Sequence, residues 1–514
     1  MTTHPAPPIT KLPTGITGFD LIAQGGIPES RSTIVAGSAG AGKTIFGLQF
    51  LQTGLRQYGE PGVLVTFEEQ PADLFRNVLS FGWDLAGAVD AGQLAIVDGT
   101  PEPGQAIMPG GHFDLSALSA RVEHAIRKVG ARRILLDSIG ALFGQLHDVT
   151  VVRLGLYRIL AALRRMKVTS IITLERAEEE GGIGRFGVEE FVADNVVVLR
   201  NRLELEKRRR TVEILKLRGA GHQKGEYPFT IDPRDGVSIS PLSAIELKQS
   251  SSEVRVSSGV ATLDTMCGGG LYRDSVILVS GATGTGKTLT VTHFLQAGIA
   301  AGERVLLVAS EESREQLARN ARMWGTDFDA AEARGLLRIV CRYPEAMGLE
   351  DHMLLLRREL EEFQPHRLGV DSITAFERGA TPKAFREFIV GLTSTVKQRE
   401  ITGLFTNTTA MLGGGESVTD SHFSTITDTI VLLRYVELFG QMHRGLAVLK
   451  MRGSWHDPDI REYRIDGTGM HIGEPFRGVH GILLGTPSYS FTDERSRMQE
   501  MFGAAGRPRP EGTA

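Results

Sequence analysis

The stretch Ser32-Thr-Ile-Val-Ala-Gly-Ser-Ala-Gly-Ala-Gly-Lys43-Thr44 joins a short apolar segment to a glycine-rich loop and the start of a helical pattern. Its last eight residues fit G-x-x-x-x-G-K-[ST]. In this pattern the glycines let the backbone wrap a phosphate, the lysine neutralises its charge and the hydroxyl holds magnesium. A loop between a strand and a helix also directs the helix N-terminus at the anion. The stretch therefore predicts an α/β nucleotide-binding domain.

The same pattern returns 244 residues later as Gly281-Ala-Thr-Gly-Thr-Gly-Lys287-Thr288, after the apolar segment Ser275–Val279. Four further pairs of segments keep their order along the chain. They are Thr14–Asp20 with Ser258–Asp264, Phe67–Glu69 with Ser310–Glu312, Leu135–Ser138 with Gly369–Ser372, and Ile214–Gly219 with Val448–Gly453. A repeat of this length is a whole domain that occurs twice, not a solenoid unit.

Within each repeat, short β-rich segments alternate with longer helical patterns, which predicts a mostly parallel sheet flanked by helices. The segments Val196–Leu203 and Thr211–Arg218 predict an appended antiparallel hairpin. The predicted organisation is an N-terminal extension (1–13), domain 1 (14–240), a linker (241–256), domain 2 (257–477), and a C-terminal segment with a mobile tail (478–514).

Composition excludes several classes of protein. The 514 residues carry 57 Lys plus Arg against 61 Asp plus Glu, a net charge of −4, which argues against a generally basic nucleic-acid coat. Two cysteines exclude a disulfide framework, and the scattered histidines lack paired ligand spacing. The apolar segments are too short to span a membrane and the N-terminus lacks a secretion signal, so we expect a cytoplasmic protein.

Acidic residues follow predicted strands at matching places in the two repeats. Asp137 and Asp371 each end a strand, where a carboxylate reaches magnesium through water. The pairs Glu68-Glu69 and Glu311-Glu312 begin 25 and 24 residues after the phosphate-loop lysines. A carboxylate there can orient an attacking water or accept a proton from a hydroxyl. We therefore predict these four glutamates as catalytic.

Two cationic pairs, Lys216 with Arg218 and Lys450 with Arg452, alternate on predicted strands, so each pair shares one face. A solvated sheet edge explains a single pair. The recurrence in both repeats, far from the phosphate loop, instead suggests cations that act on the terminal phosphate of a neighbouring chain, as in a ring with ATP between subunits.

The chain also contains longer and more specific strings than the phosphate loops alone: GEYPFTI, VRVSSGV, GATGTGKTLTV, EITGLFTNT, STITDTI and KMRGSWHD. Over residues 14–477 they resemble the KaiC family of circadian-clock ATPases and autokinases. The resemblance implies two tandem RecA-like P-loop domains, each a mostly parallel sheet flanked by helices, in a double-ring homohexamer. It also implies ATP and Mg²⁺ as cofactors, hydrolysis by domain 1, and autokinase and autophosphatase activity in domain 2.

The resemblance also implies the roles of individual residues. Ser424 and Thr425 match the phosphoacceptors, Glu311 matches the base that activates them, and Mg²⁺ falls to Thr44, Thr288 and Glu311. In the first repeat the implied ATP contacts are Gly40, Gly42, Lys43, Thr44, Ser80, Asp137, Lys216, Leu217, Arg218 and His222. In the second they are Thr283, Gly284, Thr285, Gly286, Lys287, Thr288, Leu289, Trp324, Asp371, Arg444, Lys450, Met451, Arg452, Ser454 and His456.

A difference between the two repeats supports hydrolysis by domain 1 and autophosphorylation by domain 2. When Asp194 is aligned with Asp428, Glu190 and Phe191 stand opposite Ser424 and Thr425. The first repeat has no hydroxyl at this place, so water is its expected phosphate acceptor.

Partners and departures follow from the same resemblance. It implies a KaiB-like protein on domain 1 and an output histidine kinase. The segment from Gly478 matches the family poorly, which argues against a KaiA-like activator, and Pro458 replaces a lysine of the family's site. A KaiA-independent signalling ATPase without a clock role is one alternative. Others are a scaffold whose ATP only assembles the ring, and a RecA-like nucleic-acid motor or recombinase, for which Lys207-Arg-Arg-Arg210 at a predicted solvated turn is the best support.

Overall fold

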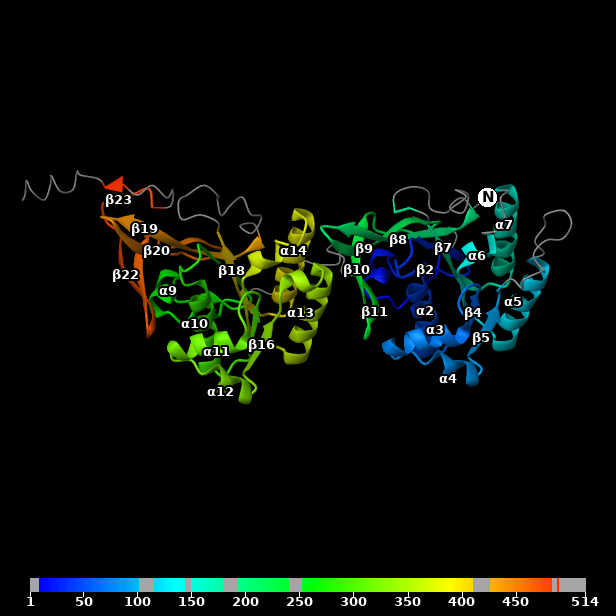
Figure 1. Cartoon of the computed structure of the whole chain (residues 1–514), viewed down its shortest axis with the longest axis horizontal. Coiled ribbons are helices and arrows are strands. Elements are labelled where there is room, and N and C mark those ends of the chain that lie inside the picture. The colour runs from blue at the N-terminus through cyan, green and yellow to red at the C-terminus, as the bar shows by residue number, and fades with distance from the viewer. Residues whose placement is uncertain are drawn as a thin grey trace, which may run out of the picture. The chain divides into compact units, whose positions relative to one another are not determined.

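The computed structural model describes residues 9–100, 115–143, 149–176, 178–179, 192–239, 252–409, 426–482 and 488–489 (Figure 1). The chain divides into two compact units, Met1–Glu246 and Leu247–Ala514. Most of the predicted linker and nearly all of the predicted mobile tail lie outside the described residues. Arg255 and Val256, at the end of the predicted linker, form a strand that pairs with Leu271–Tyr272 in the second unit.

The described strands of the first unit are β1 (Lys11–Leu12), β2 (Ile27–Pro28), β3 (Ser32–Gly37), β4 (Gly62–Thr66), β5 (Leu94–Asp98), β6 (Arg133–Asp137), β7 (Thr169–Glu175), β8 (Asn195–Glu204), β9 (Lys207–Leu217), β10 (Glu226–Asp232) and β11 (Gly236–Ile239). Its α-helices are α1 (Phe19–Ile22), α2 (Lys43–Thr53), α3 (Pro71–Val78), α4 (Leu85–Asp90), α5 (Leu115–Val129), α6 (Ile139–Phe143) and α7 (Val149–Arg165).

The described strands of the second unit are β12 (Arg255–Val256), β13 (Leu271–Tyr272), β14 (Val276–Gly281), β15 (Val305–Ala309), β16 (Leu337–Cys341), β17 (Arg367–Asp371), β18 (Thr402–Thr408), β19 (Thr429–Leu438), β20 (Gln441–Met451), β21 (Arg461–Asp466), β22 (Gly469–Pro475), β23 (Val479–His480) and β24 (Ser488–Tyr489). Its α-helices are α9 (Ala261–Met266), α10 (Lys287–Ala300), α11 (Arg314–Met323), α12 (Phe328–Ala333), α13 (Leu349–Phe363) and α14 (Pro382–Gln398).

Each unit is built on a sheet in which nine described strands pair. The strand orders are β11-β10-β9-β8-β3-β7-β6-β4-β5 and β16-β15-β17-β18-β14-β19-β20-β21-β22. The strands that carry the phosphate loops, β3 and β14, lie inside the parallel part, and the later strands add an antiparallel extension. The predicted class, two α/β domains with mostly parallel sheets flanked by helices, is confirmed.

Both faces of each sheet are buried, as a parallel sheet requires. Along β3, Val35 packs in one apolar cluster with α2, while its neighbours Ile34 and Ala36 pack in a second cluster with α5 and α7. Figure 1 shows helices on the two faces of each sheet. The strands are therefore almost uninterrupted apolar segments, because successive side chains point to opposite, equally buried faces.

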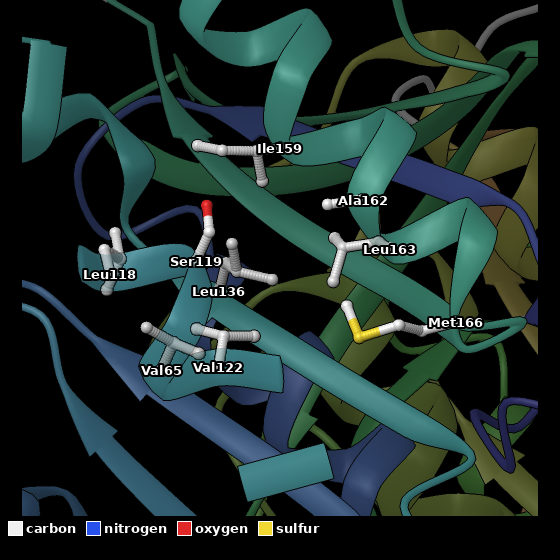
Figure 2. Close-up of a pocket in the computed structure, with 9 residues that line it drawn as sticks. All are labelled: Val65, Leu118, Ser119, Val122, Leu136, Ile159, Ala162, Leu163 and Met166. Carbon is white, nitrogen blue, oxygen red and sulfur yellow. The ribbon is translucent and has the colours of Figure 1, made fainter. Parts of the chain in front are cut away.

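A small cavity lies in the second of these clusters, under α5 and α7 (Figure 2). It is lined by Val65, Leu118, Ser119, Val122, Leu136, Ile159, Ala162, Leu163 and Met166. Ser119 is the fifth residue of the 15-residue helix α5, and its counterpart, the fifth residue of the 15-residue helix α13, is Met353, which is buried. The second unit thus places a long apolar side chain where the first has a hydroxymethyl group.

Replacing Ser119 by Met is expected to fill this cavity and raise the free energy of unfolding of the first unit by about 1 kcal/mol, since each buried methylene contributes ~0.8 kcal/mol. Urea unfolding followed by Trp83 fluorescence measures the change. Ser119→Ala is the control and should give a smaller gain. A lower unfolding midpoint for Ser119→Met would show that the cavity cannot accept the side chain.

Candidate functional site

The two phosphate loops have the conformation that their glycines predict. Gly42 and Gly286 precede α2 and α10 with φ of 94° and 95°, in the left-handed region that favours glycine. A Cβ at Gly42 would stand 2.5 Å from Cδ1 of Ile231, so a larger residue would also clash. The loops therefore join strand to helix in the tight turn that lets backbone amides surround a phosphate.

A threonine and an aspartate meet beside each loop. The Thr44 hydroxyl donates to Oδ2 of Asp137 at 2.8 Å, and Thr288 donates to Oδ2 of Asp371 at 2.6 Å. The other oxygen of Asp137 accepts a hydrogen bond from the Thr173 hydroxyl. Hydroxyl and carboxylate oxygens are hard donors that suit Mg²⁺. The donor set therefore fits the predicted metal in both units.

The loop lysines, Lys43 half-buried and Lys287 buried, lie among carboxylates. Lys43 Nζ donates to the carbonyl of Ser38 at 2.9 Å. Burial lowers the pKa of Lys43, and the negative charges of Glu175, Asp137, Glu68 and Glu179 oppose that fall. Burial likewise lowers the pKa of Lys287, opposed by Asp371 and Glu311. Each lysine is a desolvated cation at the place where a phosphate would lie.

The predicted catalytic glutamates come directly after β4 and β15, at the carboxyl edge of each sheet. Asn77 Nδ2 lies 3.4 Å from Oε2 of Glu69, and Asn320 Nδ2 donates to Oε2 of Glu312 at 2.9 Å. Burial is the largest cause of the raised pKa of Glu69 and of Glu312, followed by the charges of the neighbouring Asp137 and Asp371.

The first glutamate of each pair is the one whose charge acts on the pKa of the loop lysine. Burial and then the charge of Glu175 raise the pKa of Glu68. Glu311 accepts a hydrogen bond from the Arg378 guanidinium, with 2.9 Å between Nη2 and Oε1. A carboxylate held beside the lysine can take a proton from an attacking water or hydroxyl.

The predicted cationic pairs lie at the opposite edge of the sheets. β3 runs from Ser32 toward the phosphate loop, and β8 begins beside Thr33 at its amino end. β9 ends with Leu217 opposite Asn195, the first residue of β8, so Lys216 and Arg218 lie at the amino edge. Within one unit the length of the sheet separates this pair from the phosphate loop.

The second unit repeats this arrangement: β20 ends with Met451 opposite Thr429, beside Ile277 near the start of β14. Lys216 donates to the carbonyl of Ala193, and Lys450 donates to that of Thr427, both at 2.8 Å. One detail of the prediction is wrong. β9 and β20 end before Arg218 and Arg452, which lie one residue beyond the strands, near Asp194 and Asp428.

The other predicted ATP contacts divide by exposure. Four have buried side chains, so only their backbone can face a nucleotide; these are Leu217, Thr285, Leu289 and Met451. The remaining residues are at least partly exposed: Gly40, Ser80, His222, Thr283, Gly284, Trp324, Arg444, Ser454 and His456. The Ser454 hydroxyl accepts a hydrogen bond from Arg255 at 2.6 Å. The Arg444 guanidinium stands 5.6 Å from the centre of the Tyr435 ring.

The predicted phosphoacceptors Ser424 and Thr425 lie outside the described residues, as do Glu190 and Phe191 of the first repeat. The described residues that follow the acceptors are anchored at Thr427, whose carbonyl accepts from Lys450, and at Asp428. The Asp428 backbone N–H donates to the carbonyl of Val276 at 2.9 Å, and Val276 is the first residue of β14.

The basic run Lys207–Arg210 is not at a solvated turn, and that prediction is wrong. The turn is formed by Leu205 and Glu206, with φ of 44° and 67°, and the run begins β9. Arg208 donates to the carbonyl of Asn201 at 2.8 Å, and Arg210 donates to that of Gly40 at 3.2 Å. These arginines thus contact β8 and the phosphate loop of their own unit.

Several residues near the site were missed by the sequence argument. Asn77 and Asn320 each follow the second glutamate of the pair by eight residues, and this repeated spacing is a signal that could have found them. Thr173 and Thr406, which donate to Asp137 and Asp371, carry no such signal because many strands contain threonine. Arg378 and Glu175 meet the site only through the fold.

No group of three or more His, Cys, Asp or Glu side chains arranged to hold a metal occurs in the described part of the chain. Among the helices that the structure describes, none combines the length and the apolar composition needed to cross a bilayer.

Comparison with known proteins agrees with the duplicated organisation. The family model described as "ATPase: KaiC" matches residues 12–244 and again residues 256–476. A circadian clock protein KaiC3 of Synechocystis is 58% identical over 494 residues, which cover 96% of this chain and 98% of that protein.

Two further relatives are circadian clock oscillator proteins KaiC. The protein of Thermostichus vulcanus is 55% identical over 491 residues, covering 95% of this chain and 94% of its own. The protein of Synechococcus elongatus is 53% identical over 504 residues, covering 98% and 96%. The similarity therefore spans both units and nearly the full length of each chain.

Proposed function

Because the chain belongs to the KaiC family of circadian clock proteins, we propose that it is an ATP-hydrolysing serine/threonine autokinase that works as a ring of six chains. The first unit hydrolyses ATP. The second transfers the terminal phosphate of ATP to Ser424 or Thr425 of a neighbouring chain. The observation that carries this proposal is the separation of the phosphate loops from the cationic pairs, which lie at opposite edges of each sheet.

The short segment between Asp428 and the predicted acceptors supports transfer of phosphate between neighbouring chains. Asp428 is hydrogen-bonded to Val276, the first residue of β14, and the phosphate loop begins at Gly281, the last residue of this strand, about 17 Å away. Thr425 precedes Asp428 by three residues, which span at most about 11 Å. Ser424 precedes Asp428 by four residues, which span at most about 14 Å. The chain length from Asp428 therefore favours an ATP that is held by a neighbouring chain.

The cationic pairs support the same arrangement. Lys216 and Arg218 lie at the amino edge, where they cannot neutralise a phosphate on their own loop. A head-to-tail interface would bring this edge against the carboxyl edge of the next chain, and such an interface closes into a ring when the rotation allows it. Each ATP would then lie between a phosphate loop of one chain and the cations of the next.

The residues around the terminal phosphate have separate chemical roles. Loop amides and Lys43 or Lys287 hold the phosphates and balance their charge. Mg²⁺ would be held by Thr44 with Asp137 in the first unit and by Thr288 with Asp371 in the second. We propose Glu311 as a further ligand in the second unit. The ion, when bound, neutralises charge on the phosphates. Glu68 accepts a proton from water in the first unit, and Glu311 accepts one from the acceptor hydroxyl in the second.

Lys43→Ala is expected to impair assembly, because it removes the cation that holds ATP at the interface of the first units. Size-exclusion chromatography with light scattering should show a hexamer for the unsubstituted chain with Mg-ATP and smaller species for the variant. Lys128→Ala, an exposed change on α5, is the matched control. A Lys43→Ala chain that stays hexameric without nucleotide would sink the proposed role of ATP in assembly.

A further inference from the structure

Glu175 occupies a place at the first site that has no acidic counterpart at the second. It ends β7, and its Cα pairs with that of Gly37, the first glycine of the phosphate loop. The next residue, Arg176, donates its backbone N–H to the Gly37 carbonyl at 3.0 Å. The backbone of Glu175 therefore runs directly beside the start of the loop.

The direction of its side chain follows from the strand. Thr173 lies two residues earlier in β7, and its hydroxyl donates to Asp137, whose other oxygen accepts from Thr44. Residues two apart on a strand share a face, so Glu175 points to the side on which Thr44 and Asp137 meet. Its side chain is exposed and thus open to a bound nucleotide and to water.

Beside this geometry, the charge of Glu175 acts on both reactive groups. It is the foremost neighbouring charge in raising the pKa of Glu68, and the foremost carboxylate opposing the fall in the pKa of Lys43. Glu179 is also near but is engaged elsewhere, since it accepts hydrogen bonds from the Ser38 hydroxyl and the Asn201 backbone.

The second unit has Thr408 at the equivalent place. Thr408 ends β18 and pairs with Gly281, as Glu175 ends β7 and pairs with Gly37. Its backbone N–H donates to the Thr374 hydroxyl at 2.8 Å. One site therefore carries a carboxylate, and the other a hydroxyl, at the same position beside the phosphate loop.

We propose that Glu175 is a catalytic residue that commits the first site to water as the phosphate acceptor. Water brings two protons. Its oxygen bonds to the terminal phosphorus as the bond to the ADP oxygen breaks and one proton passes to Glu68. The other proton stays on the oxygen of the released phosphate and is oriented during the attack by a hydrogen bond that Glu175 accepts. A serine or threonine hydroxyl brings one proton and needs a single carboxylate, which the second site supplies as Glu311. This inference rests on the proposed hydrolysis by the first unit.

The test uses the full-length chain with the second site inactivated by Glu311→Gln and Glu312→Gln, so that phosphate release reports the first unit. In this parent chain, Glu175→Gln and Glu175→Thr are expected to lower kcat by about 10-fold to 100-fold while KM for ATP changes less than about twofold. Glu175→Asp should recover part of kcat because it keeps the carboxylate. Glu178→Gln, an exposed change three residues away, should match the parent.

The outcomes separate the two proposals. A parent chain that releases no phosphate would overturn the proposed hydrolysis and this inference with it. An active parent whose kcat survives Glu175→Gln, or loses only affinity for ATP, would overturn the inference and leave the hydrolysis intact. Failure of Glu175→Asp to recover more activity than Glu175→Gln would also contradict a role for the carboxylate.

Discussion

Chains carrying Glu311→Gln are expected to incorporate at least about 10²-fold less phosphate than the unsubstituted chain during incubation with Mg-ATP, because the amide cannot accept the proton of the attacking hydroxyl. Most ATP hydrolysis should persist, since the first unit has its own carboxylates. Phosphate on the chain, measured by intact mass spectrometry, and phosphate released to solution distinguish the two activities.

The neighbouring glutamate provides the comparison for this variant. Glu312 is bonded to Asn320 and shares the site but is not the proposed base, so Glu312→Gln should reduce phosphate incorporation less than Glu311→Gln does. Arg378 forms an ion pair with Glu311. Arg378→Met keeps the Glu311 carboxylate but removes the partner that holds it, so this variant tests the position of the proposed base. Undiminished phosphorylation in Glu311→Gln would show that Glu311 is not the base.

Among the substitutions proposed, Arg133→Met should lower the free energy of unfolding the most, because the Arg133 side chain is wholly buried. Its guanidinium donates to Glu60 at 2.7 Å and to the carbonyls of Pro13 and Phe50 at 3.0 and 2.9 Å. Its removal leaves Glu60 with only the more distant Arg132, at 3.7 Å, and leaves the two carbonyls without this donor; losing one member of a buried ion pair costs about 3–5 kcal/mol. Urea unfolding followed by Trp83 fluorescence should show this loss in the free energy of unfolding of the first unit.

The adjacent arginine is a matched control. Arg132 donates to Glu29 at 2.6 Å and lies 3.7 Å from Glu60, but its side chain is 56% exposed, and exposed ion pairs contribute about 0–1 kcal/mol. Arg132→Met should therefore change the free energy of unfolding by less than about 1 kcal/mol. Equal effects of the two substitutions would contradict the structural role of Arg133. The second unit repeats the arrangement with Arg367, Glu303 and Phe294.

The sequence alone could predict the parts of the site that are local strings. Each phosphate loop is eight consecutive residues, and the acidic pairs and Asp137 follow strands whose apolar pattern is plain. The duplication strengthened every one of these predictions, because chance matches rarely recur in the same order at offsets of 234 to 244 residues. The fold class follows for the same reason, since both faces of a parallel sheet are buried and its strands are continuously apolar.

The missed features depend on contacts between distant segments. Glu175 is 132 residues from Lys43 in the chain and reaches it only because β7 pairs with β3. Arg133 belongs to a residue type usually found at the surface, and nothing local indicates that Glu60 and two carbonyls enclose it. The basic run was misplaced because Leu205 and Glu206 form the hairpin turn, although neither is a typical turn residue.

The most direct test of the central claim is a mixture of two variants of the full-length chain with Mg-ATP. Glu311→Gln chains keep the acceptors but lack the base, and Ser424→Ala/Thr425→Ala chains keep the base but lack the acceptors. Peptide mass spectrometry, with one variant isotopically labelled, should find phosphate on Ser424 or Thr425 of the Glu311→Gln chains in the mixture and on neither variant alone. If the unsubstituted chain is phosphorylated and the mixture is not, although mixed hexamers form, transfer between chains is contradicted; phosphate confined to other residues would contradict the assignment of the acceptors.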